Sequence, residues 1–111
     1  MNAKALAVRA SGFQRSEDWG AAAKCYEEIL DTPLSGLDRA KTLANLMQMY
    51  DKLERKQQAL DAGLGAMELI GSVSADDNTD VLHLRGYVRG YVYRLQGRAA
   101  PSWRDTGRRS L

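Results

Sequence analysis

Side chains that commonly carry out catalysis are scarce in this chain. Among its 111 residues there are one histidine, His83, and one cysteine, Cys25. A Cys-His or Ser-His-Asp arrangement would therefore depend on His83 alone. Because His83 stands between Leu82 and Leu84, we interpret it as a surface or half-buried helical residue. Cys25 stands beside Tyr26 and is interpreted as a small packing residue, not a reactive thiol. The sequence thus predicts a protein that is not an enzyme.

Metal and cofactor sites also find little support. Residues 76–80 read Asp-Asp-Asn-Thr-Asp and resemble the start of a calcium-binding loop. They lack the glycine and the distal glutamate that such a loop needs, so we interpret them as a polar linker and helix cap. The chain shows neither the phosphate-loop nor the zinc-ligand spacing. We therefore expect no cofactor and no bound metal.

Gly86 and Gly90 have the spacing by which some membrane helices pack together. Arg85 and Arg89 lie on the same segment, so we expect no membrane insertion and predict close packing of water-exposed helices there. No apolar run approaches the ~18–20 residues that a membrane-spanning helix needs. The first ten residues are too short and polar for a signal peptide. With a single cysteine and no internal disulfide, these features predict a reducing, cytoplasmic location.

Apolar residues recur with a helical period in five segments, separated by polar or glycine- and proline-containing connectors. The predicted helices cover residues 3–15, 18–31, 38–53, 56–70 and 79–96. Asn2 and Ser16 are the predicted N-caps of the first two. Gly63 and Gly65 each cost roughly 1 kcal/mol relative to alanine inside a helix. We therefore predict that a neighbouring helix approaches closely at these glycines.

Charge divides the chain unevenly. Residues 1–80 carry nine basic and thirteen acidic side chains, whereas residues 81–111 carry seven arginines and one aspartate. This asymmetry indicates a basic end that either meets an anionic partner or docks on the acidic remainder of the chain. We predict one helical domain over residues 1–97 and a basic, flexible tail over 98–111.

Aromatic and small residues repeat along the predicted helices. The offset from Phe13 to Tyr50 is 37 residues, and so is the offset from Ala22 to Ala59. A third aromatic, Tyr93, follows Tyr50 by 43 residues. Such self-similarity is typical of helical repeat architectures.

At these residues the chain resembles the tetratricopeptide repeat family, in which each repeat of ~34 residues is a pair of antiparallel helices. The first copy matches at Leu6, Ala10, Phe13, Trp19, Ala22, Tyr26, Ile29, Leu30 and Pro33. The second matches at Leu43, Leu46, Tyr50, Ala59, Gly63 and Ala66, with Met47 in place of a small residue, and a half copy rests on Gly90, Tyr93 and Gly97. The resemblance implies an all-α, right-handed superhelix of helical hairpins with residues 79–96 as a capping helix. An unrelated five-helix bundle is the alternative.

In that family the first helix of each repeat lines a concave groove that holds an extended peptide or a partner helix. The matching groove residues here are Lys4, Ser11, Arg15, Lys41, Asn45, Gln48, Lys52, Tyr87, Tyr91 and Arg94. Because this surface is basic and polar, an acidic peptide is the expected guest. Asn45 and Gln48 are expected to bond the peptide backbone. The resemblance thus implies a non-catalytic adaptor, scaffold or small chaperone; a merely solvated face is the alternative.

One subset of the family grips the acidic tail of heat-shock chaperones with a two-carboxylate clamp. Asn45 stands where that subset has its second-repeat asparagine. The other clamp positions hold Ala7, Ser11, Leu84 and Val88 in place of lysine, asparagine and arginine. We therefore do not expect this particular chaperone role.

Two other functions are compatible with the sequence. The helix over 79–96 could pack permanently on a larger assembly or on a second copy, which predicts self-association. The arginines of the last third, with Trp103, could meet nucleic-acid phosphates, which predicts binding that weakens steeply with salt. Few lysines and no recognised nucleic-acid fold make a nucleic-acid partner the least favoured of these hypotheses.

Overall fold

The fold is entirely helical over residues 2–72 and 79–97, which are the residues that the computed structural model describes. Five helices follow one another: α1 (Ala3–Arg15), α2 (Trp19–Leu30), α3 (Gly36–Lys52), α4 (Lys56–Gly71) and α5 (Thr79–Leu95). The predicted all-α class and all five segments are confirmed, with helix ends displaced by at most two residues. The tail predicted for 98–111 lies outside the described residues.

Capping side chains set the start of three helices. Asn2 Oδ1 accepts a hydrogen bond from the Ala5 amide at 2.8 Å, as predicted. Ser35 Oγ accepts one from the Asp38 amide at 3.1 Å and begins α3. The predicted Ser16 cap of α2 is wrong, because Asp18 Oδ1 takes that role by accepting from the Ala21 amide at 3.2 Å. Ser16 instead ends α1.

The turn after α1 explains this shift. Glu17 has a left-handed backbone, with φ of 59°, and its amide donates to the Gln14 carbonyl at 3.0 Å. The Asp18 amide then donates to the Phe13 carbonyl at 2.8 Å. This pair of bonds is the Schellman arrangement, which satisfies carbonyls at a helix end. Asp18 is thereby left in place to cap the next helix.

The same turn recurs at the predicted repeat offset. Glu54 has φ of 61°, and the Arg55 amide donates to the Tyr50 carbonyl at 2.8 Å, 37 residues after the first turn. Gly97, with φ of 72°, donates to the Arg94 carbonyl at 3.0 Å and ends α5 similarly. The aromatic residues that marked the repeat in the sequence therefore occupy equivalent positions, each four residues before the residue with positive φ that follows α1, α3 or α5.

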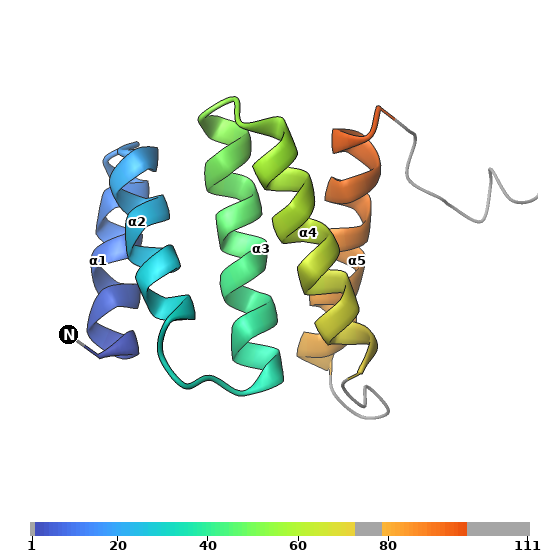
Figure 1. Cartoon of the computed structure of the whole chain (residues 1–111), viewed down its shortest axis with the longest axis horizontal. Coiled ribbons are helices and arrows are strands. Elements are labelled where there is room, and N and C mark those ends of the chain that lie inside the picture. Colours follow the sequence, from blue (N-terminus) through green and yellow to red (C-terminus); the bar gives the residue numbers. More distant parts are fainter. Residues whose placement is uncertain (1, 73–78, 98–111) are drawn as a thin grey trace, which may run out of the picture.

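Consecutive helices pack beside one another in chain order (Figure 1). In that view α1 lies behind α2, α5 lies behind α4, and α3 occupies the middle. Helix α3 packs on α2 and α4 and also approaches α5. Neither α1 and α3 nor α2 and α4 share a Cα pair within 8 Å. Helix α3 is therefore the central helix. Helices α1 and α3 stand apart beside α2, and helices α2 and α4 stand apart beside α3.

The core lies between these helices and is built from their apolar stripes. Its largest fully buried side chains are Leu46, Met47, Met49, Ile70, Val81 and Val88. Three of these belong to α3, which agrees with its central place. Removing apolar side chains from water is the main force that holds such helices together.

Gly63 allows α4 to approach two helices at once. A Cβ on Gly63 would stand 2.6 Å from Val92 Cγ2 and 2.8 Å from Met47 Sδ. The predicted close approach is therefore confirmed at this glycine. At Gly86 and Gly90 the prediction of close packing is wrong, because a Cβ there would meet no atom of another described helix within 4 Å.

Candidate peptide-binding site

A hollow of about 300 Å³ lies between α1 and α3, and α2 forms its floor. Its lining residues are Ala3, Lys4, Ala7, Tyr26, Ile29, Leu34, Asp38, Lys41, Thr42 and Asn45. Three of the predicted groove residues, Lys4, Lys41 and Asn45, thus meet at one site although they come from separate hairpins. Both lysines are exposed and Asn45 is half-buried.

The packing of the helices explains why the hollow exists. Helices α1 and α3 both flank α2 without approaching each other. On the α1 side the wall consists of the small residues Ala3 and Ala7 together with Lys4, so little side-chain volume fills the gap. On the α3 side Thr42 Oγ1 donates to the Asp38 carbonyl at 2.9 Å, which satisfies its own hydroxyl.

The chemistry of the hollow combines an apolar floor with a cationic rim. Ile29 and the ring of Tyr26 are buried at the floor. The Tyr26 hydroxyl donates to Gln14 Oε1, and burial, with a smaller contribution from Cys25, raises the pKa of Tyr26. The lining includes two lysines, Lys4 and Lys41, and one carboxylate, that of Asp38, so the rim has an excess of positive charge. Such a site favours an anionic group attached to an apolar one.

A second group of predicted residues lies where α3 approaches α5. The Tyr91 hydroxyl donates to Asp51 Oδ2 at 2.5 Å, and the Arg94 guanidinium stands 4.2 Å from the centre of the Tyr91 ring. Tyr87 packs edge-on against Tyr91, with 5.8 Å between ring centres. Burial and the bond to Asp51 raise the pKa of Tyr91. The Tyr91 hydroxyl therefore links α5 to Asp51 of α3, a contact that the sequence did not indicate, whereas Arg94 contacts Tyr91 within α5 itself.

The remaining predicted groove residues do not line the hollow. Lys52 Nζ lies 5.6 Å from the centre of the Trp19 ring, a cation–π contact between α3 and α2. Ser11 and Arg15 are exposed on α1, and Gln48 is half-buried on α3. Of the ten predicted groove residues, Lys4, Lys41 and Asn45 thus line the hollow, and the other seven lie outside it.

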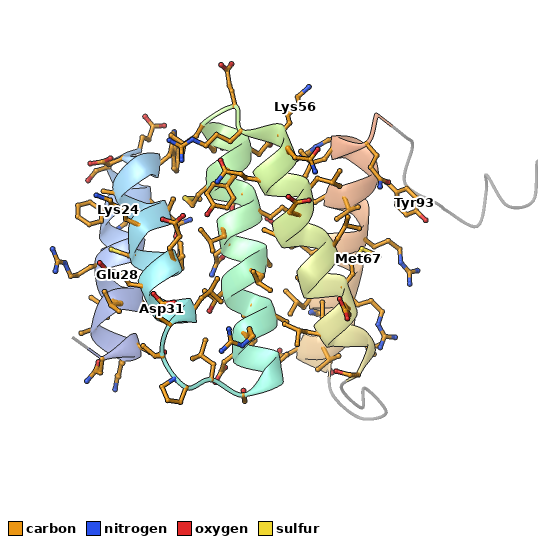
Figure 2. All side chains as sticks on the ribbon, in the orientation of Figure 1. Lys24, Glu28, Asp31, Lys56, Met67 and Tyr93 are labelled. Carbon is orange, nitrogen blue, oxygen red and sulfur yellow. The ribbon has the colours of Figure 1, made fainter. Side chains whose placement is uncertain are left out.

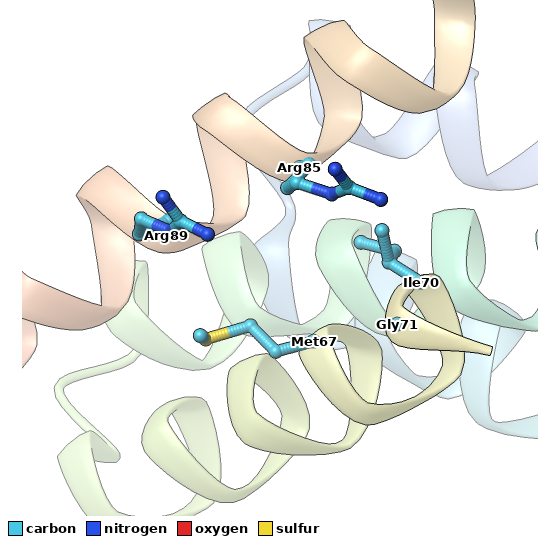
Figure 3. Close-up of a pocket in the computed structure, with 5 residues that line it drawn as sticks. All are labelled: Met67, Ile70, Gly71, Arg85 and Arg89. Atoms are coloured by element: carbon cyan, nitrogen blue, oxygen red, sulfur yellow. The ribbon is translucent and has the colours of Figure 1, made fainter. Parts of the chain in front are cut away.

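A smaller hollow of about 230 Å³ lies between α4 and α5 (Figure 3). Met67, Ile70 and Gly71 come from α4, whereas Arg85 and Arg89 come from successive turns of α5. The two guanidinium groups lie at its edge, so it is also cationic. All of its lining residues come from α4 and α5, and none of them is a predicted groove residue.

The side chains considered for catalysis lie far apart in the fold. Cys25 is buried on α2, and His83 is exposed on α5, a helix that does not pack on α2. Within residues 2–72 and 79–97 there is no cluster of three or more histidine, cysteine or acidic side chains that could hold a metal ion. In the same part of the chain, no helix is both long and apolar enough to cross a bilayer.

Comparison with known proteins identifies no relative: no protein-family model, curated protein or solved structure matches this chain.

Proposed function

We propose that this chain is a non-catalytic adaptor that binds an acidic segment of another protein in the hollow between α1 and α3. The observation that carries the proposal is the meeting of Lys4 and Lys41, from separate hairpins, above an apolar floor. The tetratricopeptide resemblance supports it, since in that family the corresponding face receives peptides. The recurrent turn after α1, α3 and α5 supports the resemblance itself.

Each part of the hollow has a distinct part in this binding. The ammonium groups of Lys4 and Lys41 attract carboxylates of the guest, and each exposed ion pair adds about 0.2–1 kcal/mol. The Asn45 amide, which can both donate and accept, bonds the guest backbone. The floor at Ile29 receives one apolar side chain, and its burial adds the larger share of affinity. Recognition therefore requires acidic and apolar residues next to each other in the guest.

An affinity purification from cell lysate tests this function. The intact chain is compared with Lys4→Glu/Lys41→Glu and with Lys24→Glu/Lys56→Glu, and bound proteins are identified by mass spectrometry. The second variant makes the same change in net charge at exposed lysines outside the hollow, one on α2 and one at the start of α4 (Figure 2). Loss of a partner in the first variant alone supports the adaptor, whereas equal retention in all three chains refutes it.

A second candidate, a structural subunit that packs through α5, is favoured by the exposed side of this terminal helix. Leu82 is 50% exposed and Tyr87 is 45% exposed, and open space surrounds Gly86 in the described structure. This role predicts a concentration-dependent mass in light scattering that Leu82→Lys abolishes. A constant monomer mass over the accessible concentration range would exclude packing of α5 on a second copy.

A further inference from the structure

A second groove, of about 410 Å³, lies on another side of α3, between α2 and α4. It exists because α2 and α4 both pack on α3 but not on each other. The lining residues are Glu27, Leu30, Asp31, Leu43, Leu46, Tyr50, Gln58, Asp61 and Ala62. None of them lines the hollow between α1 and α3. The groove is therefore a separate surface, and its occupant does not depend on the proposed adaptor function.

The groove has an apolar floor and an acidic rim. Leu30 and Leu43 are half-buried in it, so part of their apolar surface is open. Glu27, Asp31 and Asp61 supply three carboxylates, and none of the described lining residues is basic. This arrangement fits a basic segment that carries an apolar anchor.

Contacts within the chain hold two of the carboxylates in place. The Tyr50 hydroxyl donates to Glu27 Oε2 at 2.6 Å, and Gln57 Nε2 donates to Asp61 Oδ1 at 2.9 Å. Each carboxylate still has acceptor positions for a guanidinium group. Two cations lie nearby. Arg39 donates a hydrogen bond to the Leu30 carbonyl at 3.2 Å, and the charge of Arg55 slightly opposes the rise in the pKa of Tyr50. Neither lines the groove, and the three carboxylates of the lining outnumber these two cations.

The chain itself contains a segment of the matching chemistry. The 14 residues after Gly97 hold four arginines, one aspartate and one tryptophan. They are Arg98, Arg104, Arg108, Arg109, Asp105 and Trp103. Guanidinium groups pair with carboxylates through two parallel hydrogen bonds, and an indole is a large apolar anchor. Charge and anchor thus complement the rim and floor of the groove.

The segment also begins within reach of the groove. Helix α5 packs beside α4, and its last turn lies at the same upper end of the helices as the first turn of α4 (Figure 1). The first turns of α4 carry Gln58, Asp61 and Ala62 of the groove lining. Crossing one helix requires about 10 Å, whereas six extended residues from Gly97 to Trp103 span up to about 20 Å.

We propose that the Arg-rich segment 98–111 binds in the acidic groove between α2 and α4 of its own chain, with Trp103 on the apolar floor and arginines on Asp31 and Asp61. Attachment to the same chain raises the effective concentration of the segment, which favours this occupant over a free one. The charge asymmetry of the sequence then reflects an intramolecular contact. A basic partner protein would have to displace this segment to reach the groove.

Quenching of Trp103 fluorescence by acrylamide tests the proposal in the full chain. The chain has two tryptophans, so Trp19→Phe leaves Trp103 as the sole indole. Binding in the groove predicts quenching several-fold weaker than for a synthetic peptide of residues 98–111. Asp31→Asn/Asp61→Asn should raise quenching towards that of the peptide. So should Arg104→Gln/Arg108→Gln, which changes nothing within the helices.

The matched control is Glu28→Gln/Glu68→Gln, which removes the same two charges from exposed positions outside the groove lining. Glu28 instead lines a hollow on the α1 side of α2 with Arg9 and Lys24. Figure 2 shows Lys24 and Glu28 on α2. Quenching equal to that of the peptide in the parent chain overturns the proposal, as does protection that the groove variant leaves unchanged. Protection that disappears on dilution would identify a second copy as the occupant and overturn the intramolecular contact.

Discussion

Replacing Gly63 by alanine tests how closely the helices pack, because two opposing effects have known sizes. Alanine gains about 1 kcal/mol over glycine in a helix interior. The added Cβ, however, would stand 2.6 Å from Val92 Cγ2 on α5 and 2.8 Å from Met47 Sδ on α3. Met47 is flexible and can shift its thioether, whereas Val92 is β-branched and has few rotamers. Overpacking of this kind costs about 1–3 kcal/mol. We therefore expect a net destabilisation of about 1 kcal/mol.

Urea unfolding followed by circular dichroism measures this difference as a change in midpoint. Gly86→Ala is the matched control, because a Cβ there meets no described atom within 4 Å and only the helical gain of about 1 kcal/mol remains. In a Val92→Ala background the clash with Cγ2 is absent, so Gly63→Ala should cost less than it does in the parent chain. A Gly63→Ala chain at least as stable as the parent would refute the reasoning.

The remaining predictions concern turns and tyrosines. Glu17→Gly and Glu54→Gly each relieve a left-handed backbone and should raise the free energy of unfolding by about 1 kcal/mol; unchanged urea midpoints would contradict this. Burial, then the hydrogen bond and charge of Glu27, raise the pKa of Tyr50 from 10.0 to about 12. Since the folded state holds this proton more tightly, the contribution of the Tyr50 hydroxyl to the free energy of unfolding is complete below pH 10. It is lost as the pH rises to about 12. Tyr50→Phe should cost about 1 kcal/mol at neutral pH and should lessen this alkaline loss in thermal melts; an equally steep loss in the variant would exclude Tyr50 as a source.

The helices could be predicted from the sequence because the helical spacing of apolar residues and the positions of the polar, glycine- and proline-containing connectors agree in every segment. The repeat offsets were also informative, since Phe13 and Tyr50 occupy the same position in equivalent turns. The Asp18 cap could not be predicted, because it depends on a left-handed Glu17, a conformation that glutamate rarely adopts. Spacing alone likewise indicated packing at Gly86, although packing depends on which side of α5 faces α4.

The candidate site was predictable only in part. The helical period placed Lys41 and Asn45 on one side of α3, and the repeat resemblance placed Lys4 opposite them. The hydrogen bond between Tyr91 and Asp51 depends on how α3 and α5 are placed relative to each other. The spacing of apolar residues within a single helix does not determine that placement. The groove between α2 and α4 depends on a gap between helices that are not consecutive. Its acidic rim could therefore not be predicted from the sequence.

The most direct test of the adaptor function is the binding of a fluorescein-labelled peptide of alternating glutamate and leucine, followed by anisotropy. We predict that Lys4→Glu/Lys41→Glu weakens binding by about ten-fold or more, which is about 1.4 kcal/mol. Lys24→Glu/Lys56→Glu, with the same change in net charge, should bind like the parent chain. Equal weakening in both variants, or none in either, would contradict a binding site between α1 and α3.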